Sequence, residues 1–158
     1  MSYFSLNDSF SLLLESVGLI PVKELINKCR DIGMGEQPYR DLGHDSNLPQ
    51  FDKGYMFNYK TDDNEIAYLE ILEQDYKILQ AGIQITYKHS LFSKKMKKHH
   101  KYLSELCEKQ YGSGFPMKVG YADIINFGDN RTICYLSKMK MQRIKSIALR
   151  IGDKKIWR

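Results

Sequence analysis

Hydrophobic residues recur at helical spacing in the first third of the chain, in two series separated by Gly18 and Pro21. Their members are Phe10, Leu13, Leu14 and Val17, followed by Val22, Leu25, Ile26, Cys29 and Ile32. Residues 7–9 can supply a helix cap, Pro21 suits a first helical position, and Gly33 suits a helix end. We therefore predict two short amphipathic helices before residue 33.

The periodicity disappears between residues 33 and 54. Glycines and prolines interrupt this stretch repeatedly, with charges of both signs between them. A connection of this length is well above the roughly 4–6 residues that are usual in a compact domain, and such loops are either binding elements or poorly ordered. Its length makes the stretch a candidate binding loop.

Strand-like patterns follow at residues 55–59, 66–72 and 78–88, with polar breaks between them. In the third segment Ile83, Ile85 and Tyr87 alternate with polar residues, which is the period of two of a half-buried strand. We predict a three-stranded antiparallel meander with one solvent-facing side.

The strongest helical pattern covers residues 93–110, where large side chains recur at steps of three and four and lysines cover much of the other side. Gly112 suits the end of this helix. Strand patterns return at 119–127, 131–138 and 143–151, with a turn at Gly128-Asp129-Asn130.

This order of elements predicts a single α+β domain over residues 1–158. We expect an antiparallel sheet of about six strands packed against the long helix at 93–110, with two short N-terminal helices. No apolar run approaches the ~20 residues that cross a bilayer, and the first twenty residues lack a signal-peptide pattern. The chain is therefore expected to be cytoplasmic, without a membrane span.

Charge divides unevenly between the two halves of the chain. Residues 1–80 hold 7 Lys/Arg and 14 Asp/Glu, a net charge of −7. Residues 81–158 hold 17 Lys/Arg and 5 Asp/Glu, a net charge of +12, and the whole chain carries +5. Such asymmetry concerns partners and association rates more than fold. It indicates a charged partner.

Cysteine and histidine spacing gives no metal or disulfide signature. Cys29, Cys107 and Cys134 are odd in number and far apart, so we predict three buried thiols. His99 and His100 are adjacent, and on a helix they point about 100° apart, which prevents them from chelating one ion together. We predict no metal, cofactor or catalytic residue.

Two segments are candidates for partner binding. The loop carries residue types that an acid–base site would use, but nothing in the sequence fixes their geometry. The helix carries a lysine block that suits a solvated face, a protein partner or a phosphate backbone. The candidate residues are Glu36, Tyr39, Arg40, Asp41, His44 and Asp45 in the loop, and Lys94, Lys95, Lys97, Lys98 and Lys101 in the helix.

From residue 98 to 157 a basic helix runs into Lys109-Gln110-Tyr111-Gly112, a Gly/Pro loop follows, and short strands close the chain. Together with the meander at 55–88, this pattern resembles bacterial immunity proteins that neutralise contact-dependent or polymorphic toxins. The resemblance implies a toxin inhibitor that binds a cognate toxin domain and covers its active site, with charge complementarity aiding association. Many immunity proteins are acidic, and the net +5 departs from that.

Two other classes remain open on the sequence. The element order also resembles secretion chaperones, which bind an effector protein as homodimers. A nucleic-acid-binding module or small nuclease would instead place the helix lysines on phosphates.

Overall fold

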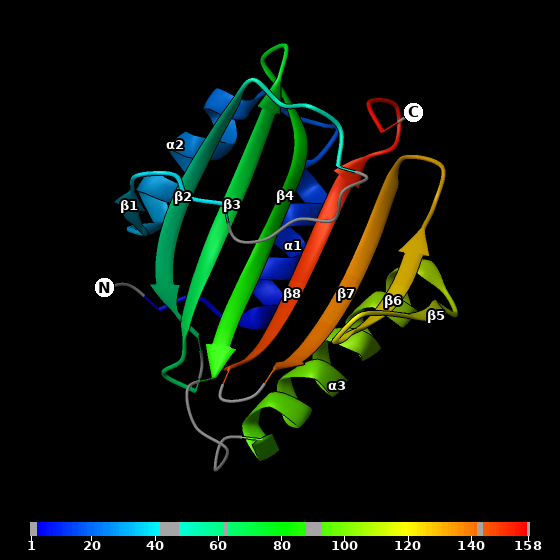
Figure 1. The fold of residues 1–158 in the computed structure, drawn as a ribbon. Coiled ribbons are helices and arrows are strands. Elements are labelled where there is room, and N and C mark those ends of the chain that lie inside the picture. The colour runs from blue at the N-terminus through cyan, green and yellow to red at the C-terminus, as the bar shows by residue number, and fades with distance from the viewer. Residues whose placement is uncertain (1–2, 42–47, 62, 88–92, 142–143, 158) are drawn as a thin grey trace.

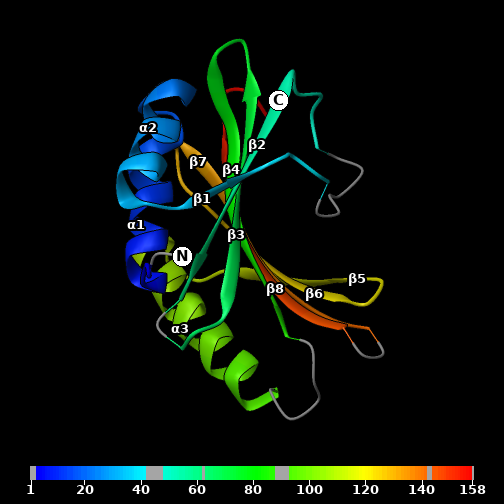
Figure 2. The same cartoon turned by 90° about the vertical axis from the view of Figure 1, so that its left-hand side faces the viewer.

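The computed structural model describes residues 3–41, 48–61, 63–87, 93–141 and 144–157. These residues form two layers, a twisted antiparallel sheet and a layer of helices on one of its faces (Figures 1 and 2). The helices are α1 (Leu6–Ser16), α2 (Val22–Ile32) and α3 (Ser93–Tyr111). The strands are β1 (Gly35–Gln37), β2 (Lys53–Lys60), β3 (Ile66–Gln74), β4 (Lys77–Tyr87), β5 (Phe115–Val119), β6 (Ala122–Gly128), β7 (Thr132–Met141) and β8 (Ile144–Asp153).

The sheet consists of two four-stranded meanders that meet at its centre, in the order β1-β2-β3-β4-β8-β7-β6-β5. The central pair, β4 and β8, runs from Gln80 opposite Gly152 to Tyr87 opposite Lys145. Because α3 connects the two meanders, the end of β4 and the start of β5 lie at opposite ends of this helix (Figure 1).

The core lies between the sheet and the three helices. Side chains opposite one another on neighbouring strands share a face, and one such row is Leu69, Ile83, Leu149 and Leu136, all with no more than 2 % exposure. The helices contribute Leu13, Leu25 and Leu103 to the same cluster. Most apolar side chains of the alternating strand patterns therefore point toward the helix layer.

Local sequence explains where the first two helices begin and end. The hydroxyl of Ser5 accepts a hydrogen bond from the Asp8 N–H and caps α1. Pro21 occupies the N-cap of α2, and Gly33 ends that helix in the left-handed conformation, with φ of 88°. Both N-terminal helices were predicted, and the C-terminal cap at Gly33 is confirmed.

The predicted sheet of about six strands packed against one long helix is wrong. The described residues contain eight strands, and α1 and α2 lie in the same layer as α3 (Figure 2). One additional strand, β1, lies inside the predicted loop at 33–54, where only three residues pair with β2. Three residues are too few to show a periodic pattern.

The other additional strand, β5, covers residues 115–119 and lies almost entirely in the Gly/Pro loop expected after the long helix, whereas the strand predicted at 119–127 corresponds to β6. Val119 pairs with Ala122, so Gly120 and Tyr121 form a two-residue hairpin turn between β5 and β6. Gly120 has φ of 59°, which a type II′ turn requires at its first central position. Two glycines precede β5 and Pro116 lies inside it, a composition typical of a loop, so the sequence did not indicate this edge strand.

The face of the sheet away from the helices is lined by a different set of side chains. One row across it contains Met56, Glu70, Gly82, Arg150, Tyr135, Asn126 and Phe115. Residues 38–41 and 48–52 lie on this side (Figure 2). We call this surface the open face.

A turn residue of the sheet closes the end of α1. Arg131 donates hydrogen bonds to the carbonyl oxygens of Val17 and Leu14, the latter at 2.9 Å. Carbonyls at a helix C-terminus lack partners within the helix, and α1 has no basic residue in its own last turn. Arg131 therefore joins the first helix to the second meander.

We expect Arg131→Ala to lower the free energy of unfolding by about 1–3 kcal/mol, because charge-assisted hydrogen bonds to partly buried carbonyls are lost. Urea unfolding followed by circular dichroism measures the change. Arg30→Ala is the control, since Arg30 forms an exposed ion pair with Glu36, and it should unfold close to the wild type. An unchanged midpoint for Arg131→Ala would contradict this role.

Candidate functional site

The exposed lysines of α3 form one stripe along the helix. Lys94, Lys97, Lys98 and Lys101 follow the i, i+3, i+4, i+7 spacing that places side chains on a common side, and all four are exposed. We call these four residues the lysine stripe. Lys95 is directed differently and is only partly exposed.

The lysine stripe opposes the stability of its own helix. Positive charge near a helix N-terminus is unfavourable, by about 0.3–1 kcal/mol per group at an exposed site, and like charges four residues apart repel. The first turn of α3 contains no acidic residue. Among the described residues, no carboxylate forms an ion pair with Lys94, Lys97 or Lys101.

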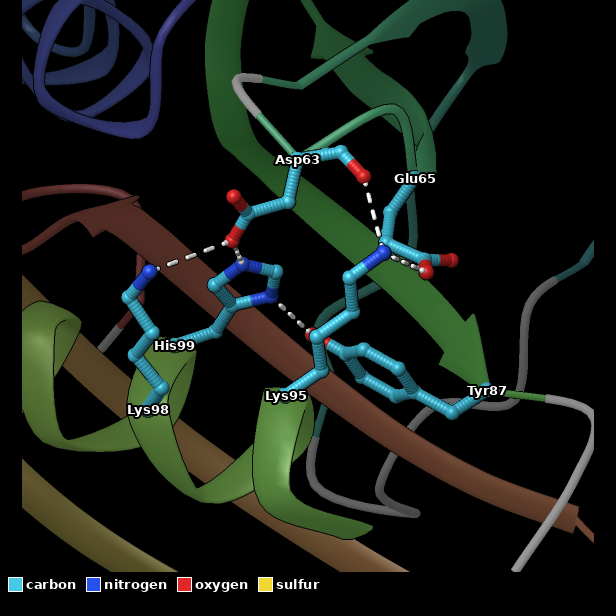
Figure 3. Close-up of polar contacts among 6 residues, drawn as sticks. All are labelled: Asp63, Glu65, Tyr87, Lys95, Lys98 and His99. Carbon is cyan, nitrogen blue, oxygen red and sulfur yellow. Dashed lines mark hydrogen bonds and ion pairs between the residues drawn. The ribbon is translucent and has the colours of Figure 1, made fainter. Parts of the chain in front are cut away.

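A buried hydrogen-bond chain attaches the same helix to the sheet (Figure 3). His99 is 3 % exposed, and both of its ring nitrogens have partners. Its Nδ1 lies 2.5 Å from the Tyr87 hydroxyl at the end of β4, and its Nε2 lies 2.6 Å from Oδ2 of Asp63 in the β2–β3 turn. We call Asp63, His99 and Tyr87 the anchor triad.

The chemistry of the three groups sets the direction of these hydrogen bonds. The hydrogen bond with His99 lowers the pKa of Asp63, so its carboxylate is ionised and acts only as an acceptor. Nε2 of His99 must then donate, and in the neutral ring Nδ1 accepts the hydroxyl proton of Tyr87. Burial raises the pKa of Tyr87, with the charges of Glu65 and Asp63 adding to the effect.

An Asp–His–hydroxyl chain has the residue order of a nucleophile-activating relay, but its terminal hydroxyl is not available to a substrate. Tyr87 is 1 % exposed, and its raised pKa keeps the phenol protonated. The arrangement is therefore suited to holding α3 against the end of β4.

Two lysines of α3 strengthen the attachment at the β2–β3 turn. Lys95 donates to the carbonyl oxygen of Asp63 at 2.9 Å and lies 3.0 Å from the Glu65 carboxylate, while Nζ of Lys98 lies 3.8 Å from Oδ2 of Asp63 (Figure 3). Of the five candidate lysines, these two are thus partly structural. The other three have no such partners in the part of the chain that the structure describes.

A groove of about 450 Å³ opens beside the anchor triad. It is lined by Leu6, Asp63, Lys98, His99, Lys101, Tyr102 and Glu105. Lys98 and Lys101 of the lysine stripe line the groove, and Tyr102, which is 40 % exposed, lies beside them. A partner side chain could enter here next to the stripe.

The structure separates Glu36 from the other described loop candidates, Tyr39, Arg40 and Asp41, which lie together on the open face. Glu36 lies on β1 and pairs with Arg30 of α2 at 2.9 Å, with about half of each side chain exposed. The ring of Tyr39 packs directly against Gly54, in the space that a Cβ there would occupy. Cζ of Arg40 lies 5.0 Å from the centre of the Tyr68 ring, and both residues are on the open face.

Asp41 is exposed and lies near Arg150 on the open face. His44 and Asp45 lie outside the described residues. The acid–base site that the loop composition suggested is therefore not assembled by the loop residues that the structure describes.

The two predicted partner-binding segments do not form one surface. Residues 38–41 run over the open face, whereas α3 lies on the helix face on the other side of the sheet (Figure 2). Within the part of the chain that the structure describes, no group of three His, Cys, Asp or Glu side chains is placed to hold a metal ion. Also within that part, no helix is long and apolar enough to span a membrane.

Sequence reasoning missed the partners of His99. The position of His99 among apolar residues at helical spacing did signal that its side chain is buried, and a buried imidazole requires partners. Asp63 and Tyr87 are 36 and 12 residues away along the chain, and only the sheet register brings them to the helix.

The open face also contains a polar centre that sequence reasoning missed. Glu70 is 3 % exposed and faces Arg150 across Gly82. A Cβ at Gly82 would lie 2.7 Å from Cγ of Arg150, so the glycine leaves room for the arginine side chain. Burial lowers the pKa of Arg150, although the nearby carboxylates of Glu70 and Asp41 act in the opposite direction.

Comparison of the chain with models of protein families, with curated proteins and with solved structures gave no match.

The anchor triad predicts a pH dependence of stability. Because the folded-state pKa of Asp63 lies below the ordinary value of 3.8, its ionised form stabilises the fold above pH 3.8, and this contribution is lost as pH falls through the lowered pKa. Asp63→Asn should be less stable than the wild type at pH 6, and the difference should shrink toward pH 3. Thermal melts across this range test it.

Asp31→Asn is the control for that series, since Asp31 is exposed on α2 and forms no ion pair with a described residue. It should follow the wild type at every pH. A stability difference for Asp63→Asn that stays constant from pH 6 to pH 3 would show that the ionised carboxylate is not the stabilising species.

Proposed function

We propose that this protein is a non-enzymatic protein-binding module, and that the lysine stripe binds an acidic surface of its partner. Following the pattern resemblance of residues 55–88 and 98–157, the partner is a bacterial toxin domain whose active site the protein covers in the cytoplasm. The observation that carries the proposal is the lysine stripe, which is exposed, lies on a helix attached to the sheet by the anchor triad and, apart from Lys98, forms no ion pair with a described carboxylate.

The energetics of α3 support a role in binding. Several lysines near the helix N-terminus and four residues apart weaken the helix, and a solvated face needs no such concentration. An acidic partner would remove this repulsion on docking and would also gain from electrostatic steering. The anchor triad holds the helix in place, so less conformational entropy is lost when the partner binds.

The composition of the stripe favours protein over nucleic acid. Arginine is the residue that recognises phosphates and guanine bases by paired hydrogen bonds, and all four stripe residues are lysines. The exposed acidic residues Glu105 and Glu108 continue the same helix. A phosphate backbone lying along α3 would meet these charges, whereas a protein surface can match both signs.

The test begins with the tagged protein as bait in an extract of its source cell, and mass spectrometry identifies what it captures. Isothermal titration calorimetry then compares the purified partner with a variant carrying Lys94→Glu, Lys97→Glu and Lys101→Glu. We expect 1:1 binding, an acidic partner surface and an affinity loss of roughly 100-fold or more. Lys98 is kept, because it contacts Asp63.

The matched control carries Lys23→Glu, Lys77→Glu and Lys155→Glu, three exposed lysines outside α3. Both variants change the net charge equally, so only the position of the charge differs. The control should bind as tightly as the wild type. Full affinity of the stripe variant, or equal losses in both variants, would overturn the proposal, and so would salt-sensitive binding of mixed oligonucleotides with no protein partner.

A further inference from the structure

Two of the three thiols meet between α3 and the sheet. Sγ of Cys107 on α3 lies 3.9 Å from Sγ of Cys134 on β7, and neither residue has any exposed surface. Cys29 lies on α2 and is equally buried. No sulfur partner accompanies it among the described residues.

Contacts around the cysteine pair hold α3 and β7 together. The hydroxyl groups of Tyr111, at the end of α3, and Thr132, at the start of β7, lie 2.8 Å apart. Phe127 and Ile151 flank Cys134 on the neighbouring strands. The sulfurs face one another because helix and strand are packed together, so the approach to a bonding distance of about 2.05 Å needs only small rotations of two side chains.

Burial protects the two thiols from oxidants in solution. The interaction with Cys107 and the burial of the site raise the pKa of the Cys134 thiol well above its ordinary value. Since the thiolate is the reactive form, the pair is protected in the closed structure and reacts when α3 opens locally.

We propose that Cys107 and Cys134 form an intramolecular disulfide that locks α3 to β7, with a small disulfide such as oxidised glutathione as the oxidant. The thiolate of one cysteine attacks a sulfur of the oxidant, and one glutathione thiolate leaves with the bonding electron pair. The thiolate of the other cysteine attacks the resulting mixed disulfide and releases the second glutathione. The protein loses two hydrogen atoms, and the oxidant is reduced to two thiols.

This modification site is independent of the proposed partner. It spans 27 residues of sequence and fastens the helix that carries the lysine stripe. Closing a loop of this length in the unfolded chain should raise Tm by roughly 5–10 °C. Reduction with dithiothreitol should return Tm to its starting value.

The folded wild-type protein is incubated with oxidised glutathione and digested without reduction. Mass spectrometry should find one cross-linked peptide joining Cys107 to Cys134, a free Cys29, and the predicted rise in Tm. Cys29→Ser is the control and should form the same link at the same rate. In Cys107→Ser, Cys134 should carry glutathione instead.

Three results would overturn the proposal: no link between Cys107 and Cys134 after prolonged oxidation, links that involve Cys29 at comparable yield, or a link without any gain in Tm. The wild-type digest alone decides the first two, so the conclusion does not depend on the folding of a variant.

Discussion

The attachment of α3 to the end of β4 is the constraint on which the arrangement of this protein depends. The helix lies in the segment of chain that links the two meanders, and its N-terminal half is the part that lysine repulsion weakens. The anchor triad offsets this repulsion because its hydrogen bonds hold the N-terminal half of the helix. Asp63 supplies negative charge near the helix N-terminus, and His99 forms hydrogen bonds with both Asp63 and Tyr87 on the strand.

The two faces of the sheet carry different kinds of side chains. The helix face contains the apolar core, and its outer surface displays the lysine stripe. The open face holds a buried Glu70 near Arg150, with Tyr39 and Arg40 packed over it. The charge asymmetry of the sequence is only partly a feature of α3, which carries six of the seventeen basic residues of the second half. The acidic residues of the first half are spread over α1, α2, the strands and the turns.

Local patterns predicted the α+β class, both N-terminal helices and α3, because each of these signals lies within one segment. The sheet was underestimated where the signal was too short, at β1, or resembled a loop, at β5, which contains Pro116 and follows two glycines. The lysines were identified from sequence, but their division into paired and unpaired members was not. That division depends on Asp63 and Glu65, which reach α3 only through the register of β2 with β3.

Hydrogen–deuterium exchange of His99→Ala against the wild type tests the central role of the anchor triad most directly. The account predicts that amides of residues 94–103 exchange about tenfold faster or more, since losing buried hydrogen bonds costs on the order of 1–3 kcal/mol locally. Residues 104–111 should keep their protection, because Cys107 and Tyr111 still pack on the sheet. Unchanged exchange at 94–103, or equal acceleration along the whole helix, would contradict the account.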